Sequence, residues 1–322
     1  MRTATLNLQT NAFGRYAVGA FNVCNLEQIH GLFRGASRAQ APIIVQFTRV
    51  IRAYAQPEML AVMLQAAEKI YPEVVFAVHL DHGDEVSCAD AIESGHYGSV
   101  MIDASHCPFE ENVEATRRVV ERAHAAGMAV EAELGQLTGI EDGMPAEVQN
   151  AILTDPGQAE EFVARTGCDS LAVAIGTSHG AYKFNGPQRL HFKRLAEIRR
   201  RVGTLPLVLH GGSAVPRDEI ERINNAGGAL KNSAGGVSDA ELRQAIPMGI
   251  TKVNIGTDGR LVWTCVHREF FSSQPSEFDF MKPGQIYMKE FADFVARKCE
   301  ALGSAGQAPA VVAGSTCELA TS

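Results

Sequence analysis

Short apolar runs alternate along the chain with longer stretches in which apolar residues recur every three or four positions. The runs are rich in β-branched residues, and several are almost wholly apolar, which is typical of parallel strands covered on both faces. The longer stretches have the period of amphipathic helices. The expected strands are Tyr16–Val23, Pro42–Thr48, Val74–His82, Ser99–Ser105, Ala129–Leu134, Ser170–Gly176, Leu205–Gly211 and Lys252–Asp258, and the clearest expected helices are Pro57–Ile70, Glu110–Ala126, Gln158–Thr166 and Gln188–Arg201.

Strand followed by helix, eight times over, predicts an α/β fold of one domain, the closed (β/α)₈ TIM barrel. The rival is a doubly wound open sheet, which usually carries a G-x-G-x-x-G turn after its first strand, and none follows Tyr16–Val23. We assign residues 1–303 to the barrel. Residues 304–322 are small and weakly polar, so we expect a disordered C-terminal tail there in which nothing packs.

Two long connections interrupt this alternation. Gly135–Thr154 follows a strand end and has little periodicity, and loops of that length in a compact domain are commonly lids or binding loops. Asn224–Ser238 is rich in Gly and Asn and lies between the seventh and eighth expected strands. We therefore expect the first of these connections to be a lid or a binding loop.

Composition and charge argue against several classes of protein function. The chain has 322 residues, 46% of them hydrophobic, which is ample material for a packed core. Its 29 basic and 37 acidic residues give a net charge of −8, which argues against a nucleic-acid partner. No apolar run approaches the ~20 residues of a membrane span, and no secretory signal pattern is present. Seven cysteines without a C-x-x-C pair indicate a reduced, cytoplasmic protein.

In a TIM barrel the active face is where the strands end, so polar residues at these ends are the first candidates for chemistry. Three of them are histidines on three different strand ends, His82, His179 and His210. Three neutral imidazoles that leave a fourth position open form a usual catalytic zinc site. The alternative for each is a lone histidine satisfied by backbone hydrogen bonds. The other polar strand-end residues are Asn22, Thr48, Asp81, Asp103, Ser105, Glu133, Asn254 and Asp258.

Glycine-bearing turns follow two of these histidines. Gly180 comes after His179, and Gly211, Gly212 and Ser213 come after His210. Exposed backbone N–H groups and a hydroxyl in such turns can cradle an anion, and barrels often bind phosphate near the loops after strands seven and eight. An ordinary tight turn would use the same glycines. By contrast, we expect His79, inside its strand, to be a hydrogen-bonded residue of the barrel interior.

At these positions the sequence resembles the class II, metal-dependent fructose-bisphosphate aldolases and their tagatose-bisphosphate relatives, from about residue 16 to 303. The resemblance rests on the motifs YAVGAFNV, HLDHG, VEAELG, AIGTSHGAYK, LHGGS and KVNIGTD, which occur in this order. It implies a lyase of glycolysis and gluconeogenesis that cleaves fructose 1,6-bisphosphate reversibly to dihydroxyacetone phosphate and glyceraldehyde 3-phosphate. In such a reaction one zinc ion per subunit stabilises an enediolate.

The resemblance also implies roles for individual residues. Asp81 would handle the proton on the C4 oxygen, and Glu141, in the long loop, would move a proton at the nucleophilic carbon. Glu133 would belong to an alternative metal position, and Arg260 would reach the distal phosphate in a neighbouring subunit's site. A homodimer or homotetramer and a monovalent cation, Na⁺ or K⁺, follow from the same resemblance. The zinc ligands would be His82, His179 and His210, and the substrate and phosphate contacts would be Asn22, Thr48, Gly180, Lys183, Gly211, Gly212, Ser213, Asn254 and Thr257.

Four departures from the family pattern bear on substrate preference. Ile140 replaces an acid next to Glu141, Thr48 replaces a serine, Ala214 a glycine and Gly256 an aspartate. None of these removes an implied metal ligand. They leave open whether the substrate is fructose or tagatose 1,6-bisphosphate, which differ at one stereocentre, and we favour fructose.

Three alternative functions would require other features of the sequence. A Schiff-base aldolase needs a desolvated lysine at a strand's carboxyl end. Lys252 opens the eighth expected strand, at the opposite rim, and Lys183 lies in an expected anion-binding loop. A metal-dependent hydrolase often carries H-x-H after its first strand, where this chain has Phe21-Asn22-Val23. A phosphosugar-binding barrel without catalysis would have no need of Asp81 and Glu141.

Overall fold

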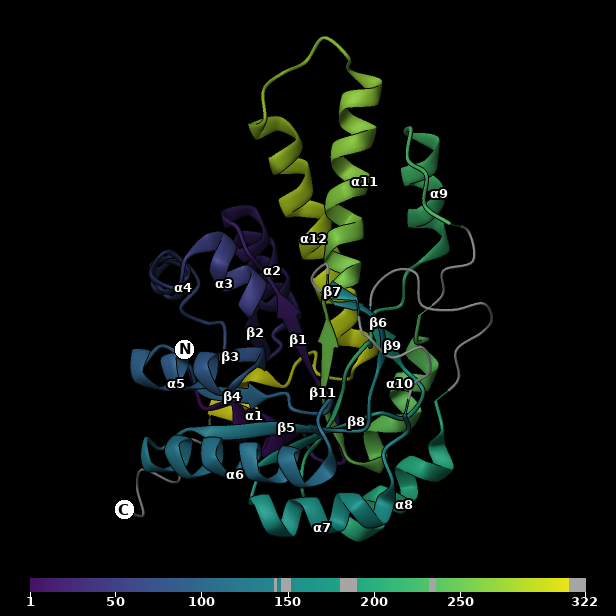
Figure 1. Ribbon diagram of the computed structural model, residues 1–322. Coiled ribbons are helices and arrows are strands. Elements are labelled where there is room, and N and C mark those ends of the chain that lie inside the picture. The colour runs from purple at the N-terminus through teal and green to yellow at the C-terminus, as the bar shows by residue number, and fades with distance from the viewer. Residues whose placement is uncertain (142–143, 146–151, 180–189, 232–235, 313–322) are drawn as a thin grey trace.

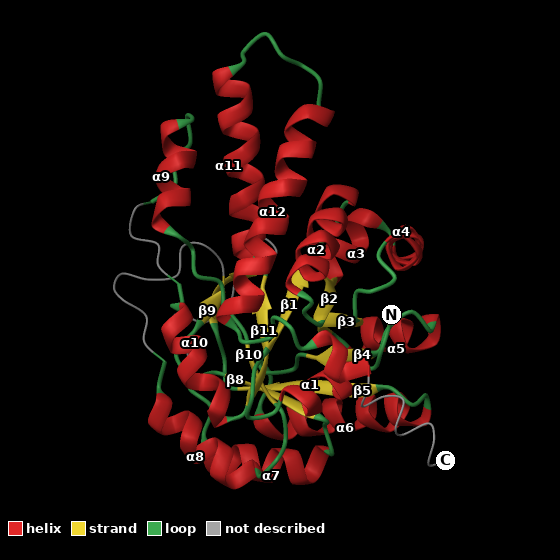
Figure 2. Cartoon of the chain, turned by 180° about the vertical axis from the view of Figure 1, so that it is seen from behind, coloured by secondary structure: helices red, strands yellow, loops and turns green. Residues whose placement is uncertain are grey.

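The computed structural model describes residues 1–141, 144–145, 152–179, 190–231 and 236–312. Eight parallel strands close into a barrel (Figures 1 and 2) in the order β1-β11-β10-β8-β5-β4-β3-β2, which confirms the predicted fold. Each observed strand falls within one or two residues of its expected start, and several end earlier than expected because their polar ends leave the ladder. The strands are β1 (Val18–Asn22), β2 (Ile43–Thr48), β3 (Phe76–Gly83), β4 (Ser99–Ile102), β5 (Ala129–Leu134), β8 (Ser170–Val173), β10 (Leu207–Leu209) and β11 (Ile250–Ile255).

Helices surround the barrel, and three of them, α9, α11 and α12, extend beyond it at one end (Figure 1). Local sequence explains where several begin. Pro57 occupies the first turn of α4, and Ser238 and Glu241 form a capping box at α10. The helices are α1 (Thr5–Ala12), α2 (Leu26–Ala39), α3 (Arg49–Ala55), α4 (Pro57–Ile70), α5 (Glu85–Ser94), α6 (Phe109–Ala125), α7 (Pro156–Thr166), α8 (Phe192–Val202), α9 (Arg217–Asn225), α10 (Asp239–Ala245), α11 (Thr257–Ser273) and α12 (Met281–Ala301), with a 3₁₀ turn at Ile246–Met248.

The interior of the barrel changes from apolar to polar along the strands. Toward the amino-terminal ends, Val18, Ile44 and Ala77 pack with Leu8 and other residues of α1. Two residues after Ile44 and Ala77 the buried side chains are the polar Gln46 and His79. Because inward-facing residues alternate along each strand, this order places the charged layer between an apolar floor and the carboxyl-terminal mouth. The buried polar residues of this layer are Gln46, His79, Glu131 and Lys252.

The expectation that nothing packs after residue 303 is wrong for residues 304–312. Ser304 and Val311 are fully buried and Ala308 nearly so, and the last two join the apolar cluster of Leu8 and Tyr16. Small residues do not prevent packing here, because their size lets this segment fit against the floor of the barrel. Residues 313–322 lie outside the described part of the chain.

The long connection after β5 contains strands of its own. β6 (Thr138–Glu141) pairs with β7 (Met144–Pro145) on one side and with β9 (Ser178–His179) on the other. The β6–β9 register sets the backbone of Gly139 opposite that of His179. This loop is therefore attached beside one of the predicted metal ligands. Among the described residues, no helix combines the length and apolar character needed to cross a membrane.

Candidate metal and catalytic site

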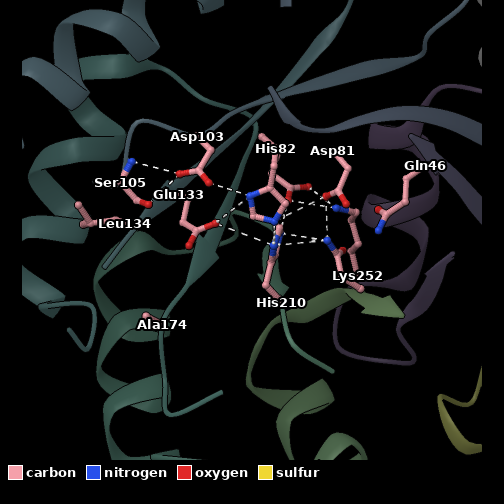
Figure 3. Close-up of polar contacts among 12 residues, drawn as sticks. Gln46, Asp81, His82, Asp103, Ser105, Glu133, Leu134, Ala174, His210 and Lys252 are labelled. Atoms are coloured by element: carbon pink, nitrogen blue, oxygen red, sulfur yellow. Dashed lines mark hydrogen bonds and ion pairs between the residues drawn. The ribbon is translucent and has the colours of Figure 1, made fainter. Parts of the chain in front are cut away.

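Two histidine rings meet at the mouth of the barrel, one from the end of β3 and one directly after β10 (Figure 3). His82 Nε2 lies 2.8 Å from His210 Nδ1, and the rings are nearly perpendicular. A carboxylate holds the other nitrogen of each ring: Asp103 Oδ2 is 2.7 Å from His82 Nδ1, and Glu131 Oε1 is 2.9 Å from His210 Nε2. Carboxylate partners of this kind orient metal-binding histidines and fix their tautomers.

This arrangement fits a divalent cation. When Asp103 and Glu131 each accept an N–H, the nitrogens that face each other, His82 Nε2 and His210 Nδ1, both present lone pairs. Two lone pairs at 2.8 Å repel unless a positive charge lies between them. Imidazole nitrogens with nearby carboxylates are a donor set that zinc binds well. Among the side chains that the structure describes, two groups are placed to share an ion: Asp81, His82 and His210, and His82, Asp103 and Glu133.

The electrostatics favour the metal-binding forms. Burial lowers the pKa of His210 below its ordinary value, although the Glu131 carboxylate acts against this, so the ring is neutral near pH 7. Burial raises the pKa of Asp103, but hydrogen bonds from His82 and Ser105 outweigh it and hold that pKa well below its usual range. Asp103 therefore stays an acceptor for His82.

Asp81 lies beside the histidines although it precedes His82 directly in the chain. Consecutive strand residues normally point to opposite faces. Here His82 has φ +46°, in the left-handed region, and the pairing register of β3 with β4 shifts between Leu80 and Gly83. This irregularity turns both side chains toward the mouth, so that Asp81 Oδ1 is 4.0 Å from His82 Nε2.

Two amides hold the Asp81 carboxylate, which is fully buried. Asn22 donates to its Oδ2 at 2.9 Å and Asn254 donates to its Oδ1 at 3.0 Å. Asn22 is oriented in turn by Gln46, whose amide donates to Asn22 Oδ1 at 2.9 Å. These N–H donors fix the direction of the carboxylate, which suits a base that must meet a substrate hydroxyl in one geometry.

The turn after β10 is held closely against its neighbours. Gly211 has φ +64°, and a Cβ there would lie 2.4 Å from the carbonyl oxygen of Ser178. The Asp258 carboxylate accepts the N–H groups of Ala214 and Val215 at 2.9 and 2.8 Å. Ser213 is buried there, and Thr257 is the first residue of α11. Gly211 is thus required by packing, and the turn lies against a helix start that suits an anion.

Several predicted site residues are not among the side chains that the structure brings together around the histidines. Thr48 pairs in register with Asp81 and caps α3 by accepting the N–H of Ile51 at 3.2 Å, a structural role. Arg260 is exposed on α11. Only the backbones of His179 and Glu141 are described, in β9 and β6, and Gly180 and Lys183 lie outside the described residues. The structure thus brings together Asn22, Asp81, His82, Glu133, His210 and Asn254.

Sequence reasoning missed the charged layer beneath the histidines. Lys252 was expected at the opposite rim, which is wrong: it is the third residue of β11, and its side chain is fully buried against Glu131. The acids Glu131 and Glu133, which alternate with alanine in an otherwise apolar strand, could have pointed to this layer. His79 was correctly expected in the interior, where its Nδ1 lies 2.6 Å from Ser99 Oγ.

Comparison with known proteins adds independent findings. The family model of class II fructose-bisphosphate aldolase matches residues 3–307. The chain is 42% identical over 296 residues to the fructose-bisphosphate aldolase of Helicobacter pylori, covering 91% of this chain and 94% of that one. It is 43% identical over 301 residues to that of Giardia intestinalis, covering 91% and 90%. Among solved structures, the YdjI aldolase from Escherichia coli K12 superposes with a TM-score of 0.75 at 29% identity, over 96% of this chain and 100% of that one.

Proposed function

The chain belongs to the class II fructose-bisphosphate aldolase family, and we propose that it cleaves fructose 1,6-bisphosphate reversibly at the mouth of its barrel. The products are dihydroxyacetone phosphate and glyceraldehyde 3-phosphate. The observation that carries the proposal is the pair of facing nitrogens on His82 and His210, each ring held by a carboxylate, beside the amide-bound Asp81.

His82 and His210, with His179 from β9, would hold the cation, and Glu133 would serve an alternative position of it. We infer zinc, because the donors are imidazoles with an open position for substrate. The bound ion would supply Lewis-acid stabilisation of the negative charge that develops on the ketone side of the substrate. The chain's part is to keep the His210 ring neutral and to direct both rings at one point.

Asp81 and Glu141 divide the proton transfers. In cleavage, Asp81 takes the proton from the C4 hydroxyl as the C3–C4 bond breaks, and the bonding electron pair stays with C3. Glu141, carried by the loop that β6 attaches beside His179, then delivers a proton to C3. In condensation the two transfers run in reverse. Each of them contributes about 10²–10⁴-fold to the rate.

The phosphates would be bound at the start of α11 and the turn after β10. Gly211, Gly212 and Ser213 offer backbone N–H groups and a hydroxyl there, and Thr257 lies at the amino-terminal end of a 17-residue helix. Besides holding Asp81, Asn22 and Asn254 would contact substrate oxygens. As the resemblance to the aldolase family implies, Gly180 and Lys183 would complete this phosphate site, with Na⁺ or K⁺ nearby.

Arg260 is exposed on the outer helix α11, where it could serve the site of a neighbouring subunit in a homodimer or homotetramer. A cytoplasmic location in glycolysis and gluconeogenesis completes the proposal. A Schiff-base mechanism has little support, because Lys252 Nζ donates to both oxygens of Glu131 and a paired ammonium is a poor nucleophile.

The test is turnover of fructose and tagatose 1,6-bisphosphate side by side, in metal-stripped enzyme, after zinc addition, and with borohydride as a trap for Schiff bases. We expect activity that requires zinc, prefers the fructose substrate and leaves no trapped adduct. Faster turnover of the tagatose substrate would reassign the substrate. Full activity after metal removal would overturn the mechanism.

A further inference from the structure

Two charged side chains lie beneath the histidines, and the reaction described above gives them no part. Lys252 is 0% exposed and Glu131 is 2% exposed. Lys252 Nζ donates to both carboxylate oxygens of Glu131, at 3.1 and 2.9 Å. A buried ion pair seldom adds stability over an apolar pair of the same size, so its presence calls for a directional role.

The placement of the pair in the barrel indicates that role. Glu131 comes from β5 and Lys252 from β11, two strands with β8 and β10 between them in the barrel order. The pair therefore crosses the interior below the end of β10, the point from which His210 emerges.

Glu131 has a third contact, with His210. Its Oε1 lies 2.9 Å from His210 Nε2, and Lys252 fixes the carboxylate through both oxygens. A neutral imidazole carries one proton, on either nitrogen. An acceptor fixed at Nε2 keeps the proton there and leaves the lone pair on Nδ1, the nitrogen that faces His82.

We propose that Glu131 and Lys252 are positioning residues: they fix the tautomer and the direction of His210 and thereby set the affinity of the site for its divalent cation. The inference rests on the proposed function, because it requires His210 to be a metal ligand. Lys252 acts only through Glu131, and Glu131 only through His210. Neither touches substrate.

The experiment compares two double variants that differ at one side chain. Glu131→Gln/Lys252→Met removes both charges but keeps an acceptor oxygen for His210, whereas Glu131→Leu/Lys252→Met removes the acceptor too. Single variants are avoided because each leaves a buried charge without its partner. The zinc dissociation constant of each metal-stripped protein is measured by competition with a chromophoric chelator, and circular dichroism checks the fold.

We expect the Gln/Met protein to bind zinc nearly as tightly as the wild type and the Leu/Met protein to bind about 10–100-fold more weakly. Equal affinities in the two double variants would overturn the proposal. A second measurement needs only the wild type. The ¹⁵N spectra of metal-free, histidine-labelled protein should show His210 protonated at Nε2. Protonation at Nδ1 would also overturn the proposal. Failure of the wild type to bind zinc would instead count against the proposed function.

Discussion

The side chains of this site are oriented by hydrogen bonds to residues that surround it. Asp81 is held by the amides of Asn22 and Asn254, and His82 by Asp103, while the left-handed φ of His82 lets two chain neighbours face the same space. The motif HLDHG identified Asp81 and His82 as candidates, but a φ of +46° at a histidine cannot be read from sequence. Tertiary packing imposes it.

At this scale, replacing the two proposed proton-transfer groups should separate the steps of the reaction. Asp81→Ala should lower cleavage by about 10²–10⁴-fold while leaving proton exchange at C3 of dihydroxyacetone phosphate measurable. Glu141→Ala should suppress that exchange by a similar factor. Steady-state cleavage and tritium exchange measure the two steps. Exchange at the wild-type rate in Glu141→Ala would show that another group moves this proton.

At the scale of elements, the sequence predicted which segments form strands and helices better than it predicted their ends. Pro57–Ile70 and Ala129–Leu134 were predicted to the residue, because proline at a helix start and alternating apolar residues are local properties. The connection after β5 was expected as a loop, yet it contains β6, because its partner in β9 lies far along the chain. Pairing between distant segments leaves little trace in a single sequence.

Glu219 on helix α9 makes the stability of the protein depend on pH. It is 8% exposed, and its Oε2 has no hydrogen-bond partner among the described residues. Burial, and then the charges of Asp258 and Asp218, raise the pKa of Glu219 to about 7 from 4.5. Between these values the folded protein binds more protons than the unfolded chain. The contribution of Glu219 to the free energy of unfolding is therefore fully present below about pH 4.5 and is lost as the pH rises through about 7.

Glu219→Gln should consequently stabilise the protein by about 1–3 kcal/mol near pH 8 and change little at or below about pH 4.5. Urea unfolding at the two pH values measures the difference. Glu221→Gln, on the exposed side of the same helix, serves as the control and should show no such pH dependence. A gain from Glu219→Gln that is equal at both pH values would contradict the burial argument.

At the scale of the whole molecule, the barrel is an apolar floor, a charged middle layer and a polar mouth that carries the site. Eight repeats of strand and helix made the barrel predictable from sequence. The layers were not predictable, because they depend on which inward-facing residues of different strands share a level. The packing of the C-terminal segment was not predictable for the same reason: Val311 lies in one apolar cluster with Leu8 and Tyr16, from the other end of the chain.

Charge placed in this floor should therefore destabilise the entire barrel. Val311→Asp should lower the free energy of unfolding by at least about 2 kcal/mol, because it buries a carboxylate among apolar side chains. Ala310→Asp puts the same charge on the adjacent exposed residue and should change it by less than about 0.5 kcal/mol. Denaturant unfolding measures the free energy of unfolding of both variants. Equal losses would show that burial of residue 311 does not stabilise the barrel.

The most direct test of the whole account is a crystal structure of the zinc-loaded protein with diffraction recorded on both sides of the zinc absorption edge. We expect one anomalous peak per subunit at the mouth of the barrel, about 2.0–2.1 Å from His82 Nε2, from His210 Nδ1 and from a ring nitrogen of His179. A peak elsewhere, or none at these nitrogens in fully loaded protein, would contradict the claim that these histidines hold the ion.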